Sequence, residues 1–201
     1  MLKTIPIFFL LFLFWGFNKL MAQTDYLQGY IIGHNLDTVY GHIKDRKGGT
    51  FAKIYKKIRF KGNGIFVKKY SPKRILGYKK GEDVFESHWI ETSTSFLTIE
   101  YLSRENLGKK YFLKVKQRGF LTYYHWEFLE YDSFVLQWVD LFKRSDEDYF
   151  VRVTQGVFGL KKKRLERYFE DCPELMEKIH SKELRLPAEI ARFYNDWLEV
   201  K

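Results

Sequence analysis

Residues 119–144 read GFLTYYHWEFLEYDSFVLQWVDLFKR and form the most apolar stretch of the chain outside its first 22 residues. If the stretch is extended, its side chains alternate between two faces. One face carries Phe120, Tyr124, Trp126 and Phe128, and the other carries Tyr123, His125, Glu127 and Leu129. If it is helical, Phe134, Trp138 and Leu141 align instead. We predict strands, because aromatic and β-branched residues dominate and because EYDS and KRSDED are typical of hairpin turns.

Short strand-like runs separated by turns precede this stretch. YIIG and TVYGHI flank a polar turn at residues 34–37 and predict an opening hairpin. Further runs are AKIYKKIRF, GIFVKKY, RILGY, DVFESHWIE, SFLTIEYL and KYFLKVKQ, broken by turns that contain glycine or lysine. Strands of this length indicate an antiparallel sandwich or barrel.

A helical pattern replaces the strand pattern after Gly159. Apolar residues recur at helical spacing in two segments, at Leu165, Tyr168 and Phe169, and at Ile190, Phe193, Tyr194, Trp197 and Leu198. We therefore predict an α+β protein with a β-rich body over residues 23–154. Two or three helices within residues 155–201 would pack on that body as one compact unit.

The aromatic side chains of Tyr124, Trp126 and Phe128 allow two interpretations. They could form a platform that stacks on sugar rings. The C-terminal helices, however, need an apolar sheet face to cover. We therefore predict that this aromatic stripe is buried core beneath the helices.

The first 22 residues have the pattern of a secretory signal peptide. Lys3 supplies the positive charge, residues 5–17 are apolar, and Ala22 suits the position before a cleavage site. The apolar run of about 13 residues is shorter than the roughly 20 residues that span a bilayer. We expect cleavage after Ala22 and a mature protein that is exported, either periplasmic or secreted.

Cys172 is the only cysteine, so no intrachain disulfide is possible. In RYFEDCPELMEKI (167–179), Asp171 and Glu174 have the spacing of a capping box, and Pro173 suits the first turn of a helix. The segment FEDCPEL contains neither a histidine base nor a glycine turn for an oxyanion site. We interpret Cys172 as a structural residue.

Residues 42–80 carry fourteen lysine or arginine residues and a single acid, Asp45. Many of these cations alternate with apolar residues, so a sheet would bury the apolar side chains and present a cationic outer face. Lys56 breaks the alternation. The candidate anion-binding residues are Lys53, Lys56, Lys57, Arg59, Lys61, Lys68, Lys69, Lys73 and Arg74.

This basic stretch has two interpretations. Lysines on exposed strands can simply prevent edge-to-edge pairing. They can also attract anions, and for an exported protein the expected partners are an anionic polymer of the cell envelope or a membrane surface. Nucleic acid, the usual partner of a basic patch, is not expected outside the cytoplasm.

The five histidines form none of the local patterns of a zinc site. His88 and His125, each followed by tryptophan, could meet across two strands, with Glu86 and Glu127 as further ligands. A polar strand face explains the same residues, and we predict no metal and no cofactor.

Two pairs of acids, Glu127 with Glu130 and Asp146 with Asp148, have the residue types of a glycosidase site. Nothing in the sequence marks them as buried, and SDED is typical of a solvated turn. We therefore name no catalytic residue.

The segments YSPKRILGY, FLTIEYL and YFEDCPELMEKI, with a last helix that contains FYN, resemble a family of exported proteins of Bacteroidetes-type bacteria. Signal peptides of that family often end in Ala-Gln, as Ala22-Gln23 does here. The resemblance covers most of the mature chain. It implies an envelope location, and no catalytic residues follow from it.

Together these features predict an exported, non-enzymatic binding or structural protein of the cell envelope. The alternative is an envelope hydrolase whose site is assembled from scattered histidines and acids. A histidine that meets two acids in a cleft would favour the hydrolase, whereas a flat cationic face would favour binding.

Overall fold

The computed structural model describes residues 26–48, 52–95, 98–130, 135–155 and 159–201. The predicted leader, with its cleavage site after Ala22, lies outside the described residues. The strands are β1 (Leu27–Ile32), β2 (Thr38–Lys47), β3 (Lys53–Lys61), β4 (Val67–Tyr70), β5 (Gly77–Lys80), β6 (Asp83–Ser95), β7 (Thr98–Leu102), β8 (Lys109–Gln117), β9 (Leu121–Leu129), β10 (Leu136–Arg144) and β11 (Tyr149–Arg152). The helices are α2 (Lys162–Tyr168), α3 (Pro173–His180) and α4 (Pro187–Val200).

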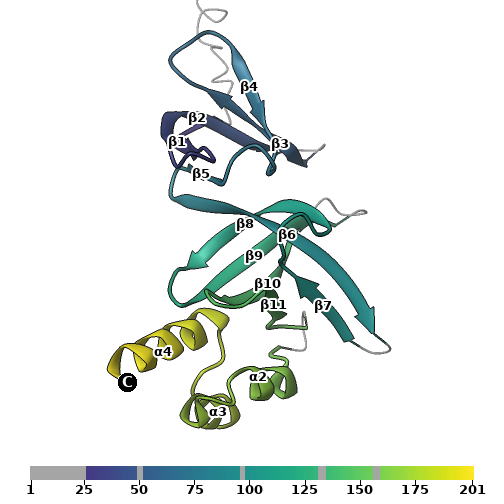
Figure 1. The fold of residues 1–201 in the computed structure, drawn as a ribbon, viewed down its shortest axis with the longest axis vertical. Helices are drawn as coiled ribbons and strands as arrows, with labels where there is room; N and C mark the ends of the chain where they lie inside the picture. Colours follow the sequence, from purple (N-terminus) through teal and green to yellow (C-terminus); the bar gives the residue numbers. More distant parts are fainter. Residues whose placement is uncertain (1–25, 49–51, 96–97, 131–134, 156–158) are drawn as a thin grey trace, which may run out of the picture.

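The strands β1 to β5 form an antiparallel N-terminal sheet in the order β4-β3-β2-β1-β5, which continues into β6. The predicted opening hairpin is confirmed, since β1 and β2 pair from Leu27 opposite Ile43 to Ile32 opposite Thr38. The buried core of this sheet includes Ile31, Ile43, Ile58, Phe60, Ile75, Tyr78 and Phe85. Figure 1 shows this sheet at one end of the molecule, above a second group of strands.

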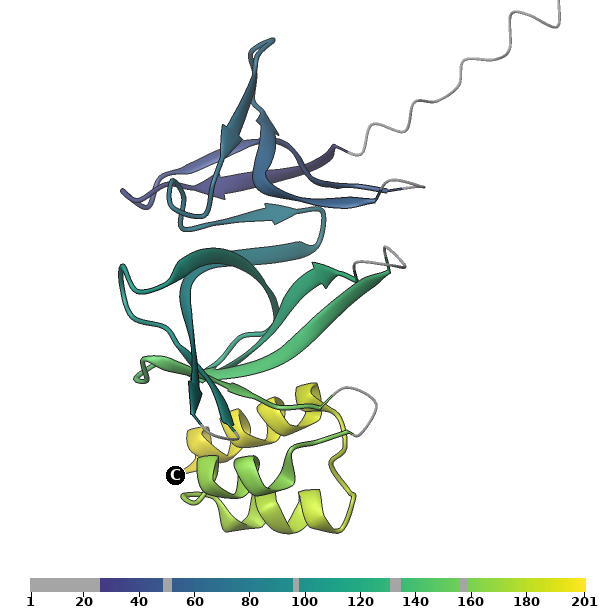
Figure 2. The ribbon, with the colours of Figure 1, turned by 90° about the vertical axis from the view of Figure 1, so that its right-hand side faces the viewer.

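The strands β6 to β11 close into a six-stranded antiparallel barrel. Its ring runs β6-β7-β11-β10-β9-β8 and is closed by the pairing of β8 with β6. Each strand contributes one residue to the buried interior, namely Ile90, Tyr101, Leu113, Tyr124, Leu141 and Phe150. Figure 2 shows the strands curving around this interior. Of the predicted sandwich or barrel, the structure therefore shows the barrel, with the N-terminal sheet attached through β6.

Strand β6 belongs to both units because different parts of its length pair with different neighbours. On one edge, Asp83 to Glu86 pair with β5, and Glu91 to Ser95 pair with β7. On its other edge, Val84 to Ile90 pair with β8. This strand of 13 residues is long enough to serve both the sheet and the barrel.

The predicted strands in residues 119–144 are confirmed as the hairpin β9–β10, in which Leu121 lies opposite Arg144 and Leu129 opposite Leu136. Most of the predicted turn EYDS falls outside the described residues. Alternation along β9 directs Tyr124 into the barrel and Tyr123 out of it, toward the helices.

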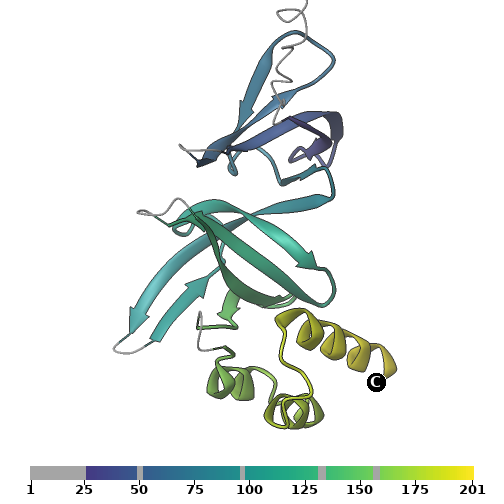
Figure 3. The same ribbon diagram turned by 180° about the vertical axis from the view of Figure 1, so that it is seen from behind.

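The three helices cover one end of the barrel, and α4 contacts β8 and β9 (Figure 3). The predicted α+β class is thus confirmed. The helices cover the side chains of Leu121, Tyr123, Phe142, Val151 and Val153. The expectation that they cover Tyr124, Trp126 and Phe128 is wrong, because closing the barrel gives Tyr124 and Trp126 partners from the other strands instead. Phe128 is 45% exposed.

The segment around Cys172 differs in one detail from its prediction. Pro173 begins α3 and Cys172 is fully buried, as expected, and burial raises the pKa of its thiol. The predicted capping box is absent, because α3 has no side-chain cap. Asp171 instead accepts hydrogen bonds from Arg144 Nη2 at 2.7 Å and from the Tyr194 hydroxyl.

None of the helices in the described ranges is both long enough and apolar enough to cross a membrane.

Candidate functional site

A pocket of about 590 Å³ lies where the N-terminal sheet meets the barrel. We call it the basic cleft. Its lining comprises Asp45, Arg46, Ile54, Tyr55, Lys56, Lys57, Ser71, Pro72, Lys73, Tyr78, Phe85, Gly108, Lys109, Lys110, Tyr111, Phe112, Trp126 and Glu127. These residues come from β2, β3, the β4–β5 loop, β5, β6, the start of β8, and β9. The volume is in the range of sites for small organic ligands.

An irregularity in β3 forms one wall of the basic cleft. Lys44 of β2 lies opposite Arg59, whereas Arg46 lies opposite Ile54, so four residues of β3 face the single residue Asp45. Such bulges turn side chains away from the regular alternation of a strand. As a result, Tyr55, Lys56 and Lys57 are consecutive in the sequence and all line the cleft.

A buried ionic network lies beneath this irregularity. Asp45, which is 2% exposed, accepts hydrogen bonds from Arg46 Nη2 at 2.9 Å, from the Tyr78 hydroxyl at 3.1 Å and from Lys80 Nζ. Arg46 Nη2 also lies 2.8 Å from Glu127 Oε2 on β9 and so connects the N-terminal sheet to the barrel. Burial alone would raise the pKa of Asp45, but Arg46 and Lys80 hold that pKa below its usual value. The negative charges of Asp45 and Glu127 are therefore balanced by the positive charges of Arg46 and Lys80.

Five lysines surround this balanced network, namely Lys56, Lys57, Lys73, Lys109 and Lys110. In the part of the chain that the structure describes, none of the five makes an ion pair with a carboxylate. Lys73 Nζ and Lys110 Nζ instead lie 4.9 Å and 5.7 Å from the centre of the Trp89 ring. Burial lowers the pKa of Lys110, so a nearby anion would stabilise its charged form.

The nine predicted anion-binding residues separate into groups. Lys56, Lys57 and Lys73 line the basic cleft, and Lys53 lines an adjoining pocket. The remaining five lie outside both pockets: Arg59, Lys61, Lys68, Lys69 and Arg74. Arg59 stacks on the Tyr55 ring at 4.5 Å from its centre. Of the nine residues, the structure therefore places three in the basic cleft and one in the adjoining pocket.

Sequence reasoning missed Lys109 and Lys110, which the pairing of β8 with β6 brings to the same cleft. They lie almost thirty residues after the basic stretch ends at Lys80. The only local sign of these two cations is the sequence GKK (108–110), which follows the turn SRENL.

The two histidines proposed for a metal or hydrolase site lie on opposite faces of the barrel wall. His88 contacts the interior rings of Tyr124 and Phe150 and has one acid, Glu86, with Nε2 and Oε2 separated by 3.3 Å. His125 stacks on Trp138 outside and has one acid, Asp140, at 3.3 Å. His88 and His125 therefore do not meet, and the metal site considered as the less favoured interpretation is not formed from them.

The acids proposed for such sites are either held by other contacts or exposed. Burial would raise the pKa of Glu86, but hydrogen bonds from His88 and Tyr124 and the charge of Arg118 lower it to about 2. Glu127 pairs with Arg46, and both Asp146 and Asp148 are exposed. Among the described residues, no three histidine, cysteine or acidic side chains form a group that could hold a metal ion.

Comparison of the chain with protein-family profiles, with curated proteins and with solved structures found no match. The resemblance to exported proteins of Bacteroidetes-type bacteria stays a prediction.

Proposed function

We propose that this chain is an exported binding protein, not an enzyme, and that it captures an anionic ligand in the basic cleft. The observation that carries the proposal is the convergence of five lysines from three separate segments on one pocket. Lys56 and Lys57 come from β3, Lys73 from the β4–β5 loop, and Lys109 and Lys110 from β8.

The charges around the cleft support an anion rather than a cation as ligand. Asp45 and Glu127 are already paired with Arg46 and Lys80, so the five lysines leave an excess of positive charge. A concave surface of one charge sign concentrates ions of the opposite sign. Phosphate, sulfate or carboxylate groups on a polymer of the cell envelope have the required chemistry.

The hydrolase alternative has less support. Within the described ranges, each candidate histidine meets one acid and not two, and the side chains of Tyr123 and Thr154 already donate to Asp140 at 2.6 Å. Export and an envelope location are part of the proposal because residues 1–22 predict a cleavable leader.

Charge reversal in the cleft tests the proposed binding site. The double variant Lys56→Glu/Lys57→Glu should bind inorganic polyphosphate at least about tenfold more weakly than the native chain at low salt. Isothermal titration calorimetry would measure this affinity. For the native chain, affinity should fall steeply as salt increases, because counterions compete for the same lysines.

The matched control is Lys68→Glu/Lys69→Glu, which makes the same change in net charge on the β3–β4 hairpin, outside the cleft. It should bind polyphosphate nearly as well as the native chain. Equal losses in the two double variants would mean that net charge, and not the cleft, binds the polymer. Affinity that does not change with salt would also contradict the proposal.

The tip of the β3–β4 hairpin supports a second candidate function, attachment to an anionic membrane surface. Ile65 and Phe66 are 84% and 79% exposed, and this hairpin projects away from the helices (Figure 2). The exposed side chains of Lys61, Lys68 and Lys69 flank the tip. Apolar side chains beside lysines are the combination that inserts into the interface of an anionic bilayer.

Vesicle sedimentation tests the hairpin tip. The variant Ile65→Ser/Phe66→Ser should bind vesicles that contain phosphatidylglycerol at least about tenfold more weakly, since the two apolar side chains that would enter the bilayer are lost. The control Val39→Ser/Tyr40→Ser also removes two exposed apolar side chains, which lie on β2, and should bind like the native chain. Equal binding by all three proteins would rule out the tip as the membrane contact.

A further inference from the structure

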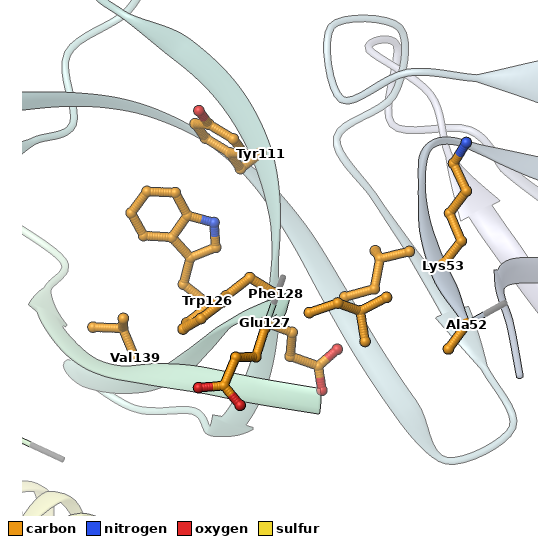
Figure 4. Close-up of a pocket in the computed structure, with 10 residues that line it drawn as sticks. Ala52, Lys53, Tyr111, Trp126, Glu127, Phe128 and Val139 are labelled. Carbon is orange, nitrogen blue, oxygen red and sulfur yellow. The ribbon is translucent and has the colours of Figure 1, made fainter. Parts of the chain in front are cut away.

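A second pocket, of about 890 Å³, adjoins the basic cleft beside the wall of the barrel. We call it the apolar chamber. Its apolar lining includes Ile54, Tyr111, Trp126, Phe128, Leu129 and Val139. In Figure 4, the rings of Tyr111 and Trp126 lie close together on the barrel side, and Lys53 lies on the other side of the pocket.

The two pockets lie directly beside each other, because they share lining residues. Ile54, Tyr111, Trp126 and Glu127 line both of them. A ligand that lies across these residues would therefore have one end among the lysines and the other end in the apolar chamber.

The chamber offers little to a polar ligand. Its charged residues are Lys53, Glu127 and Glu130, and Glu127 is already paired with Arg46. The indole of Trp126 packs against Tyr111 with ring centres 4.9 Å apart, which fixes a broad apolar wall. Phe128 is 45% exposed on this concave surface, so its ring would lose contact with water when an apolar group fills the chamber.

We infer that the ligand is an anionic amphiphile, whose acidic head group binds the lysines of the basic cleft and whose alkyl tail fills the apolar chamber. This inference rests on the proposed anion-binding function and specifies the ligand class. A purely polar acidic polysaccharide would use the cleft but leave the chamber filled with water. A neutral lipid would use the chamber but leave the lysines without a partner.

A series of alkyl phosphates tests the inference. Hexyl, octyl and decyl phosphate, each below its micelle concentration, share one head group and differ only in tail length. Calorimetry should show an affinity that rises by up to about fourfold for each added methylene group that enters the chamber. Inorganic phosphate supplies the head group alone, and decyl glucoside supplies the tail with a neutral head.

The variant Phe128→Gln tests the chamber itself, because it replaces an exposed apolar wall residue with a neutral polar one. It should weaken decyl phosphate binding by about tenfold and leave polyphosphate binding unchanged. The matched control is Phe120→Gln. Phe120 is 39% exposed, precedes the same strand and lies outside the chamber, so this change should alter neither affinity.

The outcomes separate the inference from the function on which it rests. All the alkyl phosphates could bind no more tightly than inorganic phosphate while polyphosphate still binds the cleft. In that case the inference of an amphiphilic ligand is wrong and the anion-binding function stands. If decyl glucoside binds as tightly as decyl phosphate, the requirement for a charged head is wrong. If Lys56→Glu/Lys57→Glu leaves polyphosphate binding intact, the proposed function fails as well.

Discussion

Asp45 is the charged residue on which the junction between the N-terminal sheet and the barrel depends. It is 2% exposed and lies within hydrogen-bonding distance of Arg46, Tyr78 and Lys80, and Arg46 in turn reaches Glu127 of the barrel. A buried charge is tolerated only while its partners remain, because each charge has lost its hydration.

The substitution Asp45→Asn should therefore destabilise the protein strongly. It leaves the buried ammonium of Lys80 without a countercharge, and we expect a loss of about 3 to 5 kcal/mol in the free energy of unfolding. Urea denaturation at pH 7 measures this loss. The control is Asp83→Asn, whose pair with Lys114 is half exposed, and it should cost less than about 1 kcal/mol.

The same residue predicts a dependence on pH. Because the pKa of Asp45 is lower in the folded protein than its usual value of 3.8, its ionised form stabilises the fold above that pH. That contribution is lost as the pH falls below 3.8 toward the folded-state pKa. The stability difference between the native chain and Asp45→Asn should thus shrink between pH 5 and pH 3. A difference that stays constant over this range would contradict the assignment.

Lys56 shows that a residue pattern can reveal an interruption in a strand without revealing its cause. It is the one lysine that breaks the alternation of β3, and in the structure it lies within the irregularity opposite Asp45. The break is visible in the sequence, but its meaning is not. Whether an interruption is a turn, a bulge or a misassigned strand depends on which residues of the neighbouring strand face it.

At the level of elements, helix α4 is fixed to the barrel by a polar contact as well as by its apolar stripe. Asn195 Oδ1 accepts from the backbone N–H of Leu121 at 2.8 Å, and Asn195 Nδ2 donates to the Leu121 carbonyl at 3.0 Å. The approach needs a glycine at position 119, because a Cβ there would lie 2.2 Å from Asn195 Nδ2.

Removal of this contact by Asn195→Ala should cost about 1 to 3 kcal/mol, because it leaves buried backbone groups of Leu121 unpaired. The midpoint of urea unfolding measures the cost. Asp196→Ala, on the exposed side of the same helix, should change stability by less than about 0.5 kcal/mol. If the two substitutions have equal effects, Asn195 does not anchor the helix.

The elements themselves were largely predictable. Aromatic and β-branched residues with turn-like flanks identified the strands around residues 119–144. The helical stripes at Leu165 and Ile190 identified α2 and α4, because such a stripe reflects burial of one helix face. The capping box at Asp171 was not formed, because Arg144 of β10 and Tyr194 of α4 compete for the same carboxylate. Spacing along the chain contains no information about such distant competitors.

For the whole molecule, the decisive event is the closure of the barrel. The pairing of β8 with β6 gives Tyr124 and Trp126 an interior of their own, so the helices cover the opposite face of β9 instead. The same pairing brings Lys109 and Lys110 opposite the basic strand β3 and so completes the basic cleft. A sandwich made from the same strands would have placed these residues elsewhere.

Four properties follow from the amino-acid sequence alone: the fold class, the faces of most elements, the structural character of Cys172 and the concentration of positive charge in residues 42–80. These properties depend on composition and local periodicity, which involve residues that are close together in the sequence. Three further features appear only in the folded molecule: the barrel closes, β6 serves two units, and lysines from three segments meet beside an apolar chamber. Strand partners and pockets depend on contacts between residues far apart in the sequence, and alternation shows which face a side chain occupies but not what that face meets.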